Sequence, residues 1–451
     1  MKVQPTRVVI LNVGDQQYPQ DDLAKVIADF RAKVRSLDIA NVVCECTIMN
    51  DEDADVAATE VAKHHFDAII VDYVSWHITP YVMRTLKDYR TIPILVYGSG
   101  GWTDSTGKLI APAAAAGTTA LTPVLREFNY KYVCVNGKPD EAVRLDDIER
   151  FLRVVSATQA VRHSRIGLYG YADMGLYSCA YNKTLAAKKI GVDIEDYLAY
   201  DLVDEMNSFT DEEVAECVKE IQAKTVCVNE VKPEVIARVA RLYLVMKGKK
   251  DKRGLDAISI KCVYGVTQMG FNPCLAQSLL ADKDTSVICE CDAYGMLTGI
   301  ILSRVSGKAS AFVEHYEVFD DSILVGVCGF IPRDFIEGDF RIRSANLGEY
   351  NTGISNVSKM KIGECTFARL FETNGIYKLF LGKGKAEPNV KWTEHGWAEP
   401  TPDFPSVMLH PSTPVKEYLD KVPGQHIVML YGDWTEDIKL FCKLMDIQVV
   451  E

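Results

Sequence analysis

The 451-residue sequence lacks an apolar run long enough to cross a membrane. Its longest apolar stretches, such as DAIIVDYV and IPILVYG, have the length of β-strands. The N-terminal segment carries a short apolar run that ends at Gly14-Asp15, without the continuous apolar region and cleavage site of a signal peptide. We therefore expect a cytoplasmic protein with no membrane partner.

The sequence also lacks the cysteine spacings that are typical of zinc sites or disulfide frameworks. Its thirteen cysteines are odd in number and scattered, and no C-x-x-C motif occurs. Most lie in apolar contexts, as Cys134 and Cys227 do, where a thiol behaves as a small hydrophobic side chain. We expect reduced thiols, as is usual in the cytosol.

Basic residues are too few and too dispersed to indicate a nucleic-acid partner. The formal net charge is -12, and no stripe of Lys and Arg offsets it. The dense basic run Lys247–Arg253 stands where a helix would end and is typical of a solvated surface. A nucleotide motif is missing too, because the turn after RIGLYG contains Gly170 and Gly175 but neither G-x-G-x-x-G nor a P-loop lysine.

Apolar and amphipathic segments alternate through the first two thirds of the chain. Runs such as VVILNV and DAIIVDYV are separated by stretches such as LAKVIADFRAKVRSL, which predicts parallel strands covered by helices. Later, short apolar runs are joined by loops rich in Gly, Pro, Asn and Asp, which predicts antiparallel strands. We therefore predict an α/β fold class with two consecutive doubly wound parallel-sheet domains, residues 1–162 and 163–300. An antiparallel β-barrel-like domain, residues 301–451, would follow and complete the site.

The most informative pattern combines a carboxylate-rich step in ICECDAYGMLTGIIL with a histidine in GQHIVMLYGDW. Glu290 and Asp292 stand two residues apart in an expected strand, where alternation places both side chains on one face. His426 lies at the mouth of another apolar run. Two carboxylates and an imidazole suit Mn²⁺ or Mg²⁺, and beside such a metal they can move a proton between the carbons of a sugar. Gln268 lies in a loop at the carboxyl end of its strand, where open α/β sheets bind ligands.

The same residues also have structural interpretations. An acid at a strand end, such as Asp292, is often a helix cap or a surface residue, and a lone histidine beside an apolar run is more often part of the core. Aromatic residues beside polar groups, such as Trp76 and Trp392, are common in sugar sites but also in cores and at oligomer contacts. The histidines that compete with His426 on equal terms are His315, His395 and His410.

Longer segments follow a recognisable order along the chain. The segments DYVSWHITP, TIPILVYGSGG, AAAAGTTALTPVLREFNYKYVCVNG and GLYGYADMGLYSCAYNKTLAAKKIGVDIEDYLAYDLVDEM precede CECDAYGMLTGIIL and QHIVMLYGDWTEDIKLFCKLMDIQV. Over nearly the whole chain this order resembles the L-fucose isomerase family, within the superfamily that includes L-arabinose isomerase. The resemblance makes Trp76 the counterpart of an active-site tryptophan, Asp292 and His426 metal ligands, and Gln425 the counterpart of a substrate-contacting asparagine.

One position departs from the family pattern. The family's third ligand is a glutamate just after the strand that ends here in Lys261-Cys262, but no carboxylate lies between Lys261 and Asn272. Gln268 is the nearest candidate. In the family that glutamate and the aspartate form the proposed acid/base pair of an ene-diol route. In this chain Glu290, or a metal-bound water, would take the second role.

The resemblance implies an intracellular, metal-dependent aldose–ketose isomerase that acts on a hexose or a modified six-carbon sugar, 6-deoxy and 6-sulfo hexoses included. Asp292 and Glu290 are the predicted catalytic residues. The predicted ligands of Mn²⁺, or of another divalent cation such as Mg²⁺ or Co²⁺, are Asp292, His426 and Gln268. The predicted sugar contacts are Gln425, Trp76 and Trp392.

The resemblance also implies a homo-oligomer, a trimer or a hexamer, because Trp76 would reach the site across a subunit boundary. An anionic sugar needs one basic side chain in the pocket, and the candidates for it are Arg333, Arg341 and Arg343. Two alternatives remain open. One is a sugar-binding homologue without catalysis, and the other is an epimerase or lyase on the same scaffold.

Overall fold

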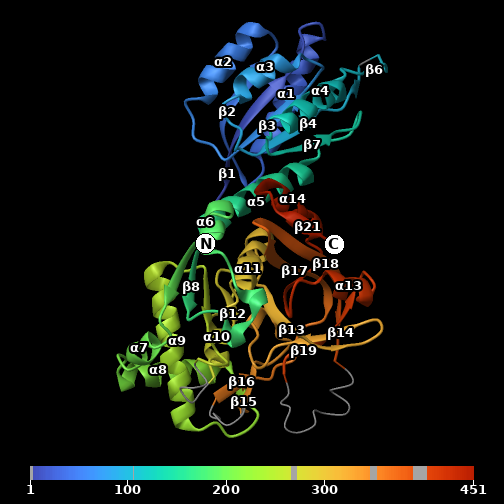
Figure 1. Cartoon of the computed structure of the whole chain (residues 1–451). Helices are drawn as coiled ribbons and strands as arrows, with labels where there is room; N and C mark the ends of the chain where they lie inside the picture. The colour runs from blue at the N-terminus through green and yellow to red at the C-terminus, as the bar shows by residue number, and fades with distance from the viewer. Residues whose placement is uncertain (1–3, 105, 266–271, 346–352, 390–403) are drawn as a thin grey trace. The chain divides into compact units, whose positions relative to one another are not determined.

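The computed structural model describes residues 4–104, 106–265, 272–345, 353–389 and 404–451. Contacts within the chain divide it into two compact units, residues 2–159 and residues 160–451. Figure 1 colours the chain from blue at the N-terminus to red at the C-terminus. The predicted separation of residues 163–300 from residues 301–451 as domains stays a prediction.

The N-terminal unit is built on a parallel sheet with the strand order β2-β1-β3-β4-β7. From β1 the chain adds β2 on one side of the sheet and then β3, β4 and β7 on the other. At this switch point, between β1 and β3, doubly wound sheets present the carboxyl ends of two strands to one crevice. The strands of this sheet are Thr6–Val13 (β1), Ala40–Ile48 (β2), Ala68–Tyr73 (β3), Ile94–Gly98 (β4) and Tyr132–Asn136 (β7). A small hairpin joins Trp102–Thr103 (β5) to Leu109–Ile110 (β6). The helices are Gln20–Arg35 (α1), Asp51–Val61 (α2), Thr79–Leu86 (α3), Ala114–Glu127 (α4) and Leu145–Arg162 (α5), the last of which continues past the end of this unit.

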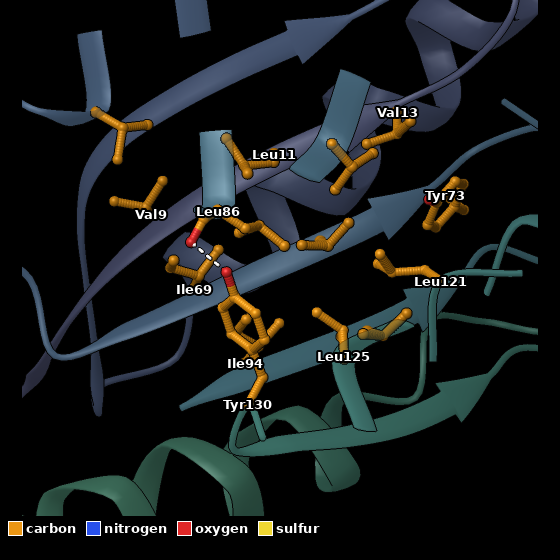
Figure 2. Close-up of a cluster of buried hydrophobic side chains, with 14 of the residues drawn as sticks. Val9, Leu11, Val13, Ile69, Tyr73, Leu86, Ile94, Leu121, Leu125 and Tyr130 are labelled. Atoms are coloured by element: carbon orange, nitrogen blue, oxygen red, sulfur yellow. Dashed lines mark hydrogen bonds between the residues drawn. The ribbon is translucent and has the colours of Figure 1, made fainter. Parts of the chain in front are cut away.

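The core of this unit follows from the apolar strands. Every residue of β3 and β4 is buried, as expected for strands that helices cover on both faces. Figure 2 shows the cluster in which Leu11 and Ile69 of the sheet pack with Leu121 and Leu125 of α4. Burying one such side chain contributes about 2 kcal/mol to stability. The Tyr130 hydroxyl donates a hydrogen bond of 2.9 Å to the carbonyl of Leu86, so its polar atom is satisfied within the apolar cluster.

The second unit begins with another parallel sheet, of strand order β12-β11-β8-β9. From β8 the chain adds β9 on one side of the sheet and then β11 and β12 on the other, so the switch point lies between β8 and β11. The carboxyl ends of these strands and of β12 can therefore supply ligand-binding side chains. The strands are Arg165–Tyr169 (β8), Asp193–Tyr197 (β9), Ala257–Ile260 (β11) and Ser286–Cys289 (β12). The helices are Lys183–Lys189 (α6), Asp201–Met206 (α7), Asp211–Lys224 (α8), Pro233–Arg253 (α9), Cys274–Leu280 (α10) and Ala293–Ser306 (α11). Two short 3₁₀ turns, Asp173–Gly175 (η1) and Tyr177–Cys179 (η2), follow β8.

Six of the remaining described strands close into an antiparallel barrel (Figure 1). Its order is β17-β20-β13-β14-β19-β18, and a further pairing of β17 with β18 completes the ring. The barrel strands are Ala311–Val318 (β13), Ile323–Gly326 (β14), Gly363–Thr373 (β17), Ile376–Glu387 (β18), Ser406–Pro411 (β19) and His426–Tyr431 (β20). Gln448–Val450 (β21) adds to β18 in parallel, and the helices here are Val415–Lys421 (α13) and Thr435–Met445 (α14). The predicted fold class, two parallel α/β sheets followed by an antiparallel barrel, is confirmed.

One predicted strand of the C-terminal region lies outside the barrel. The segment FRIRSANL contributes Arg341–Ala345 (β15), which pairs with Val226–Cys227 (β10) and Gly353–Asn356 (β16) in a separate small sheet. A 3₁₀ turn, Arg333–Phe335 (η4), precedes β15. Of the basic side chains predicted to contact an anionic sugar, Arg341 and Arg343 therefore belong to this small sheet and Arg333 to the turn before it. None of the three lies in the barrel wall.

No described helix combines the length and the apolarity that spanning a bilayer requires. All thirteen cysteines lie in described segments and are free thiols. The Sγ atoms of Cys44 and Cys46 on β2 lie 3.7 Å apart, which is a contact and not a disulfide bond.

Candidate functional site

Glu290 and Asp292 follow β12 and do not stand in it, so the expected strand alternation is wrong for them. The strand ends at Cys289, and Glu290 and Cys291 adopt left-handed φ values of 64° and 52°. Asp292 is the N-cap of α11, where its Oδ1 accepts the backbone N–H of Gly295 at 3.0 Å. An aspartate is a favoured N-cap, so the chain turns here because a helix begins. Two successive non-glycine residues in the left-handed region are uncommon and occur preferentially at functional sites.

His426 brings the two acids together even though they do not share a strand. It is the first residue of β20 and only 1% exposed. Its Nδ1 lies 2.9 Å from Oδ2 of Asp292, and its Nε2 lies 3.3 Å from Oε2 of Glu290. Because an ionised carboxylate only accepts hydrogen bonds, an N–H at Nδ1 points to Asp292, while Nε2 faces Glu290. The predicted grouping of Glu290, Asp292 and His426 thus exists within one unit.

A buried arginine from the barrel completes the surroundings of Asp292. Arg369 on β17 is 1% exposed, and its Nη1 forms an ion pair with Oδ2 of Asp292. Its Nη2 donates to the carbonyl of Ser178 at 2.8 Å. Burial alone would raise the pKa of Asp292, but the Arg369 guanidinium and His426 hold it well below its usual range. Asp292 is therefore a fixed anion with both oxygens engaged.

Glu290 has the opposite environment. It is 3% exposed, and its Oε2 has no hydrogen-bond partner among the described residues. Burial, followed by the nearby carboxylates of Glu314, Asp292 and Asp173, raises the pKa of Glu290 to about 8. A carboxyl group with such a pKa can both accept and release a proton near neutral pH.

Glu314 is a further acid that the sequence patterns did not single out. It lies on β13 directly opposite His426 on β20, as its register partner in the antiparallel pair. Burial raises the pKa of Glu314 as well. Its side chain has no hydrogen bond or ion pair with any described residue.

A fourth acid and a lysine lie at the same end of the parallel sheet. Asp173 is fully buried and accepts the backbone N–H groups of Val263 at 2.6 Å and Met174 at 2.8 Å. Its own N–H donates to the carbonyl of Glu290 at 3.0 Å. The Nζ atom of Lys261, which directly follows β11, lies 3.9 Å from Oδ1 of Asp173. Asp173 thus ties the turn of Glu290 to a positively charged side chain.

Two groups of described side chains can each place three ligand atoms within 4.8 Å of one another. One is Cys179, Asp292 and His426, and the other is Glu290, Glu314 and His426. The buried Oε2 of Glu290 and Nε2 of His426 lack hydrogen-bond partners among the described residues, as ligand atoms that await a cation do. Carboxylate and imidazole ligands suit a divalent cation such as Mn²⁺ or Mg²⁺. The residues present fit the metal that the resemblance implies.

The other predicted site residues are placed differently. Gln425 precedes β20 and is exposed, and its carbonyl accepts from Nδ1 of His315 at 2.7 Å. Trp76 belongs to the N-terminal unit, where its side chain is 39% exposed. Gln268 and Trp392 lie outside the described residues, so their predicted roles as metal ligand and sugar contact stay predictions.

The competing histidines have other partners. His315 bonds to the Gln425 carbonyl and to the Tyr418 hydroxyl, and Nε2 of His410 lies 3.5 Å from a carboxylate oxygen of Glu387. His395 lies outside the described residues. Of the histidines that the structure describes, His426 is the one that meets two buried carboxylates.

Sequence reasoning missed Glu314, Arg369 and Asp173. Each is a charged residue inside a short apolar segment, in FVEHYEV, CTFARLF and GYADM respectively. A charge in such a segment is rarely buried without a partner, and this signal could have identified all three. Their partners come from distant segments, so the pattern alone would not have told which residue each one meets.

The C-terminal part of the chain matches a family model. The model is described as "L-fucose isomerase, C-terminal domain" and covers residues 333–451. The matched segment contains both Arg369 and His426.

Several curated proteins are similar to most of the chain. "Sulfoquinovose isomerase" of Priestia aryabhattai is 19% identical over 399 residues, which is 86% of this chain and 86% of that protein. The protein of the same name from Alkalicoccus urumqiensis is 21% identical over 394 residues, or 85% and 86% of the two chains. "L-arabinose isomerase" of Actinobacillus succinogenes is 26% identical over 282 residues, or 57% of this chain and 56% of that protein. Together with the family model and the fold, these matches support the L-fucose and L-arabinose isomerase superfamily for this chain.

Proposed function

We propose that this chain is an aldose–ketose isomerase that converts a 6-deoxy-6-sulfo hexose into the corresponding ketose with the help of a divalent cation. The isomerase class is supported by the family model and by the names of the relatives. The sulfonated substrate is supported by the relatives named sulfoquinovose isomerase, which align with about 85% of the chain. The observation that carries the proposal is the convergence of Glu290, Asp292 and His426 from separate elements into one buried cluster.

Isomerisation of an open-chain sugar through an ene-diol removes the proton from C2 and returns a proton at C1. Glu290 is the residue we assign to this transfer, because its carboxyl group is buried beside His426 and its pKa is raised to about 8. Asp292 is unsuited to carry the proton, because its pKa lies well below the usual range beside Arg369. Asp292 instead fixes the imidazole of His426 through the 2.9 Å contact at Nδ1. Of the two predicted catalytic residues, Glu290 thus keeps its role in proton transfer, whereas Asp292 orients His426.

A divalent cation, when bound, would act as a Lewis acid on the sugar and lower the barrier to proton transfer by several kcal/mol. The residues that would hold it are those of the two groups around His426. Glu290, Asp292 and His426 are each no more than 3% exposed. Their burial would keep bulk water away from the proton during its transfer.

Lys261 is the residue we assign to the sulfonate. It is 9% exposed, and its Nζ lies 3.6 Å from the centroid of the Tyr171 ring and 3.9 Å from Asp173. At that distance Asp173 does not hold it by a short hydrogen bond, so the three ammonium donors remain able to turn toward an anion. Arg333 fits less well, because it donates to the carbonyls of Ile336 and Gly338 in its own turn.

The test is proton exchange in D₂O followed by NMR, with sulfoquinovose, glucose, 6-deoxyglucose, L-fucose and L-arabinose as substrates. The expected result with sulfoquinovose is formation of a ketose, with deuterium at C1 of that ketose and at C2 of the recovered aldose, and loss of all three in Glu290→Gln. Turnover of L-fucose or L-arabinose alone would contradict the sulfonated substrate but keep the isomerase. A ketose formed without deuterium would contradict the proton transfer, and an epimer, a cleaved product or no ketose from any sugar would contradict the isomerase itself.

The role of Lys261 is tested separately. Lys261→Met should raise the KM for sulfoquinovose at least tenfold, because one charge-assisted contact is lost, and should leave the KM for an uncharged hexose unchanged. Lys359→Met, which removes an exposed lysine of the same unit, is the matched control. An equal change for charged and uncharged sugars would contradict the assignment.

A cytoplasmic location and a trimeric or hexameric assembly with shared sites belong to the same proposal. Size-exclusion chromatography with light scattering checks the assembly. Trp76→Ala should then lower activity if neighbouring subunits share sites.

A further inference from the structure

We infer that the divalent cation binds on the Nε2 side of His426, held by Glu290 and Glu314, while Arg369 fills the Nδ1 side and keeps a cation away from Asp292. This inference rests on the proposed function and changes the ligand set that the family resemblance implies. Glu314 becomes a ligand, and Asp292 becomes a positioning residue that acts through His426.

The first argument is the arrangement of the ligand atoms. Glu314 and His426 are register partners on the paired strands β13 and β20. Glu290 approaches the same point from the left-handed turn after β12. One carboxylate oxygen from each acid and one ring nitrogen of His426 lie within 4.8 Å of one another. Rigid barrel strands therefore supply two of the three ligands, which favours a precise site.

The second argument is the set of unsatisfied atoms. Oε2 of Glu290 and Nε2 of His426 are buried and have no hydrogen-bond partner in the described part of the chain, although they lie 3.3 Å apart. Glu290 is 3% exposed and His426 is 1% exposed, so bulk water does not compensate for the missing partners. Two carboxyl groups that meet in such a place repel each other as anions unless one of them is protonated or a cation lies between them. The side of the ring that faces Glu290 therefore has both the unpartnered ligand atoms and the pair of acids that a divalent cation requires.

The third argument is that the Nδ1 side is already filled. Oδ2 of Asp292 accepts from Arg369 and from Nδ1 of His426, and Oδ1 accepts the N–H of Gly295 at 3.0 Å. The Arg369 guanidinium keeps its charge at any physiological pH, so a divalent cation bound by Asp292 would meet a fixed positive charge. The alternative ligand group, which combines Asp292 with Cys179 and His426, is disfavoured for that reason.

The orientation of the ring agrees with this division. A histidine that binds a metal commonly donates its other ring N–H to a carboxylate, which fixes the tautomer and makes the metal-facing nitrogen more basic. Asp292 stands in that position at 2.9 Å from Nδ1, and the other ring nitrogen, Nε2, lies 3.3 Å from Oε2 of Glu290. Two carboxylates and one imidazole form a hard ligand set that suits Mn²⁺ or Mg²⁺. Glu314 thus supplies, from a barrel strand, the carboxylate that is missing between Lys261 and Asn272.

The test measures binding of Mn²⁺ to the metal-depleted full-length protein by the loss of the free-ion EPR signal. Glu314→Gln should weaken the affinity at least tenfold, and Cys179→Ser should leave it within twofold of the wild type. Glu317→Gln, which changes an exposed glutamate on the same strand, is the matched control and should also stay within twofold. Thermal melting of each variant establishes that it is folded. An unchanged affinity in Glu314→Gln, or a tenfold loss in Cys179→Ser, would overturn the inference, as would a wild-type protein that binds no Mn²⁺.

A second readout uses the absorption spectrum of bound Co²⁺. A cation held by Glu290, Glu314 and His426 has no sulfur ligand, so the wild type should show no thiolate charge-transfer band in the near ultraviolet. Glu314→Cys should produce such a band. A band in the wild type that disappears in Cys179→Ser would place the ion at the Nδ1 side and overturn the inference.

Failure of the inference and failure of the proposed function are distinguishable. If Glu314→Gln binds Mn²⁺ normally while the wild type converts a sugar, the ligand set is wrong and the isomerase stands. If Glu314 controls Mn²⁺ binding but no sugar is converted into a ketose, the metal site stands and the isomerase is wrong.

Discussion

The two units each bury an acid near the carboxyl end of a parallel sheet, and they surround it in opposite ways. In the N-terminal unit, Asp72 on β3 is fully buried, and its two oxygens accept from the hydroxyl of Ser99 at 2.8 Å and the amide of Asn12 at 2.7 Å. Arg31 in turn donates to Asn12 at 2.7 Å. In the second unit, Oε2 of Glu290 is equally inaccessible and has no such partner among the described residues. A buried acid whose hydrogen bonds are complete serves the fold, whereas one that is left incomplete retains the capacity to bind or to exchange a proton.

The largest effect that would separate the two acids is catalytic. Glu290→Gln should lower kcat by about a thousandfold, because a positioned proton-transfer group contributes a factor of roughly 10² to 10⁴. The same change should leave the melting temperature equal or higher, because it removes a buried acid whose Oε2 has no hydrogen-bond partner among the described residues. Steady-state kinetics and thermal denaturation measure both. Unchanged kcat would remove Glu290 from the mechanism, and a strong loss of stability would make it a structural acid like Asp72.

The next effect concerns the charge that balances Asp292. Arg369→Met should lower the free energy of unfolding of the second unit by about 3 kcal/mol, because it leaves a buried carboxylate without its cation. The double variant with Asp292→Asn should recover part of this loss, since no charge then remains unpaired. Urea denaturation measures the free energy of unfolding of the single and the double variant. Arg341→Met, which replaces an exposed arginine, is the control and should change stability by about 0.5 kcal/mol at most. A loss below 1 kcal/mol in Arg369→Met would mean that Asp292 is solvated or neutral.

Removal of divalent cations should affect one acid and not the other. At a Mn²⁺ concentration of about 100 times Kd, binding stabilises the native state by about 2.7 kcal/mol, and EDTA should abolish this. Hydrogen exchange with mass spectrometry should then show faster exchange in peptides that cover β12, the start of α11 and β20. Peptides that cover β3 should not change. An equal increase in exchange in both sheets would mean that Asp72, whose hydrogen bonds are complete, and Glu290, which we propose binds the cation, do not differ in this way.

The smallest effect is a pH dependence in the N-terminal unit. Burial raises the pKa of Asp72 to about 7, despite the hydrogen bonds from Ser99 and Asn12. An unfolded aspartate has a pKa near 4, so between roughly pH 4 and pH 7 the native state binds more protons than the unfolded state, and stability falls as the pH rises through that window. Asp72→Asn should flatten this dependence and cost about 1 kcal/mol at the acidic end, where its amide cannot accept both hydrogen bonds. Thermal melts from pH 5 to pH 8 measure this dependence, and Asp38→Asn, which changes an exposed aspartate, is the control. If the melting temperatures of Asp72→Asn and the wild type change with pH in parallel, Asp72 stays ionised throughout this range.

Much of the fold was predictable because its patterns are local. Alternation of apolar strands and amphipathic helices predicted both parallel sheets, and short apolar runs with polar loops predicted the antiparallel barrel. The superfamily and the isomerase class were predictable from the order of segments, which the matches to known proteins support. The strand boundary at Cys289 was not, because the left-handed turn at Glu290 and Cys291 leaves no local mark in the sequence.

The candidate site was predictable only in part. Glu290, Asp292 and His426 stood out because polar residues border apolar runs, and the structure brings them together. Glu314 and Arg369 were missed because their roles depend on contacts between strands that lie far apart in the sequence. The predicted roles of Gln425, Trp76, Gln268 and Trp392 stay predictions.

The ion pair of Arg369 and Asp292 also has a consequence for the order of events during synthesis. The ribosome makes Asp292 77 residues before Arg369 and 134 residues before His426. Until β17 and β20 emerge, the nascent parallel sheet therefore carries an acid without its counterion and the proposed metal site without its imidazole. A chain truncated before β17 should neither fold its second unit nor capture a metal ion, so we expect the proposed cation to bind only after β20 has been made.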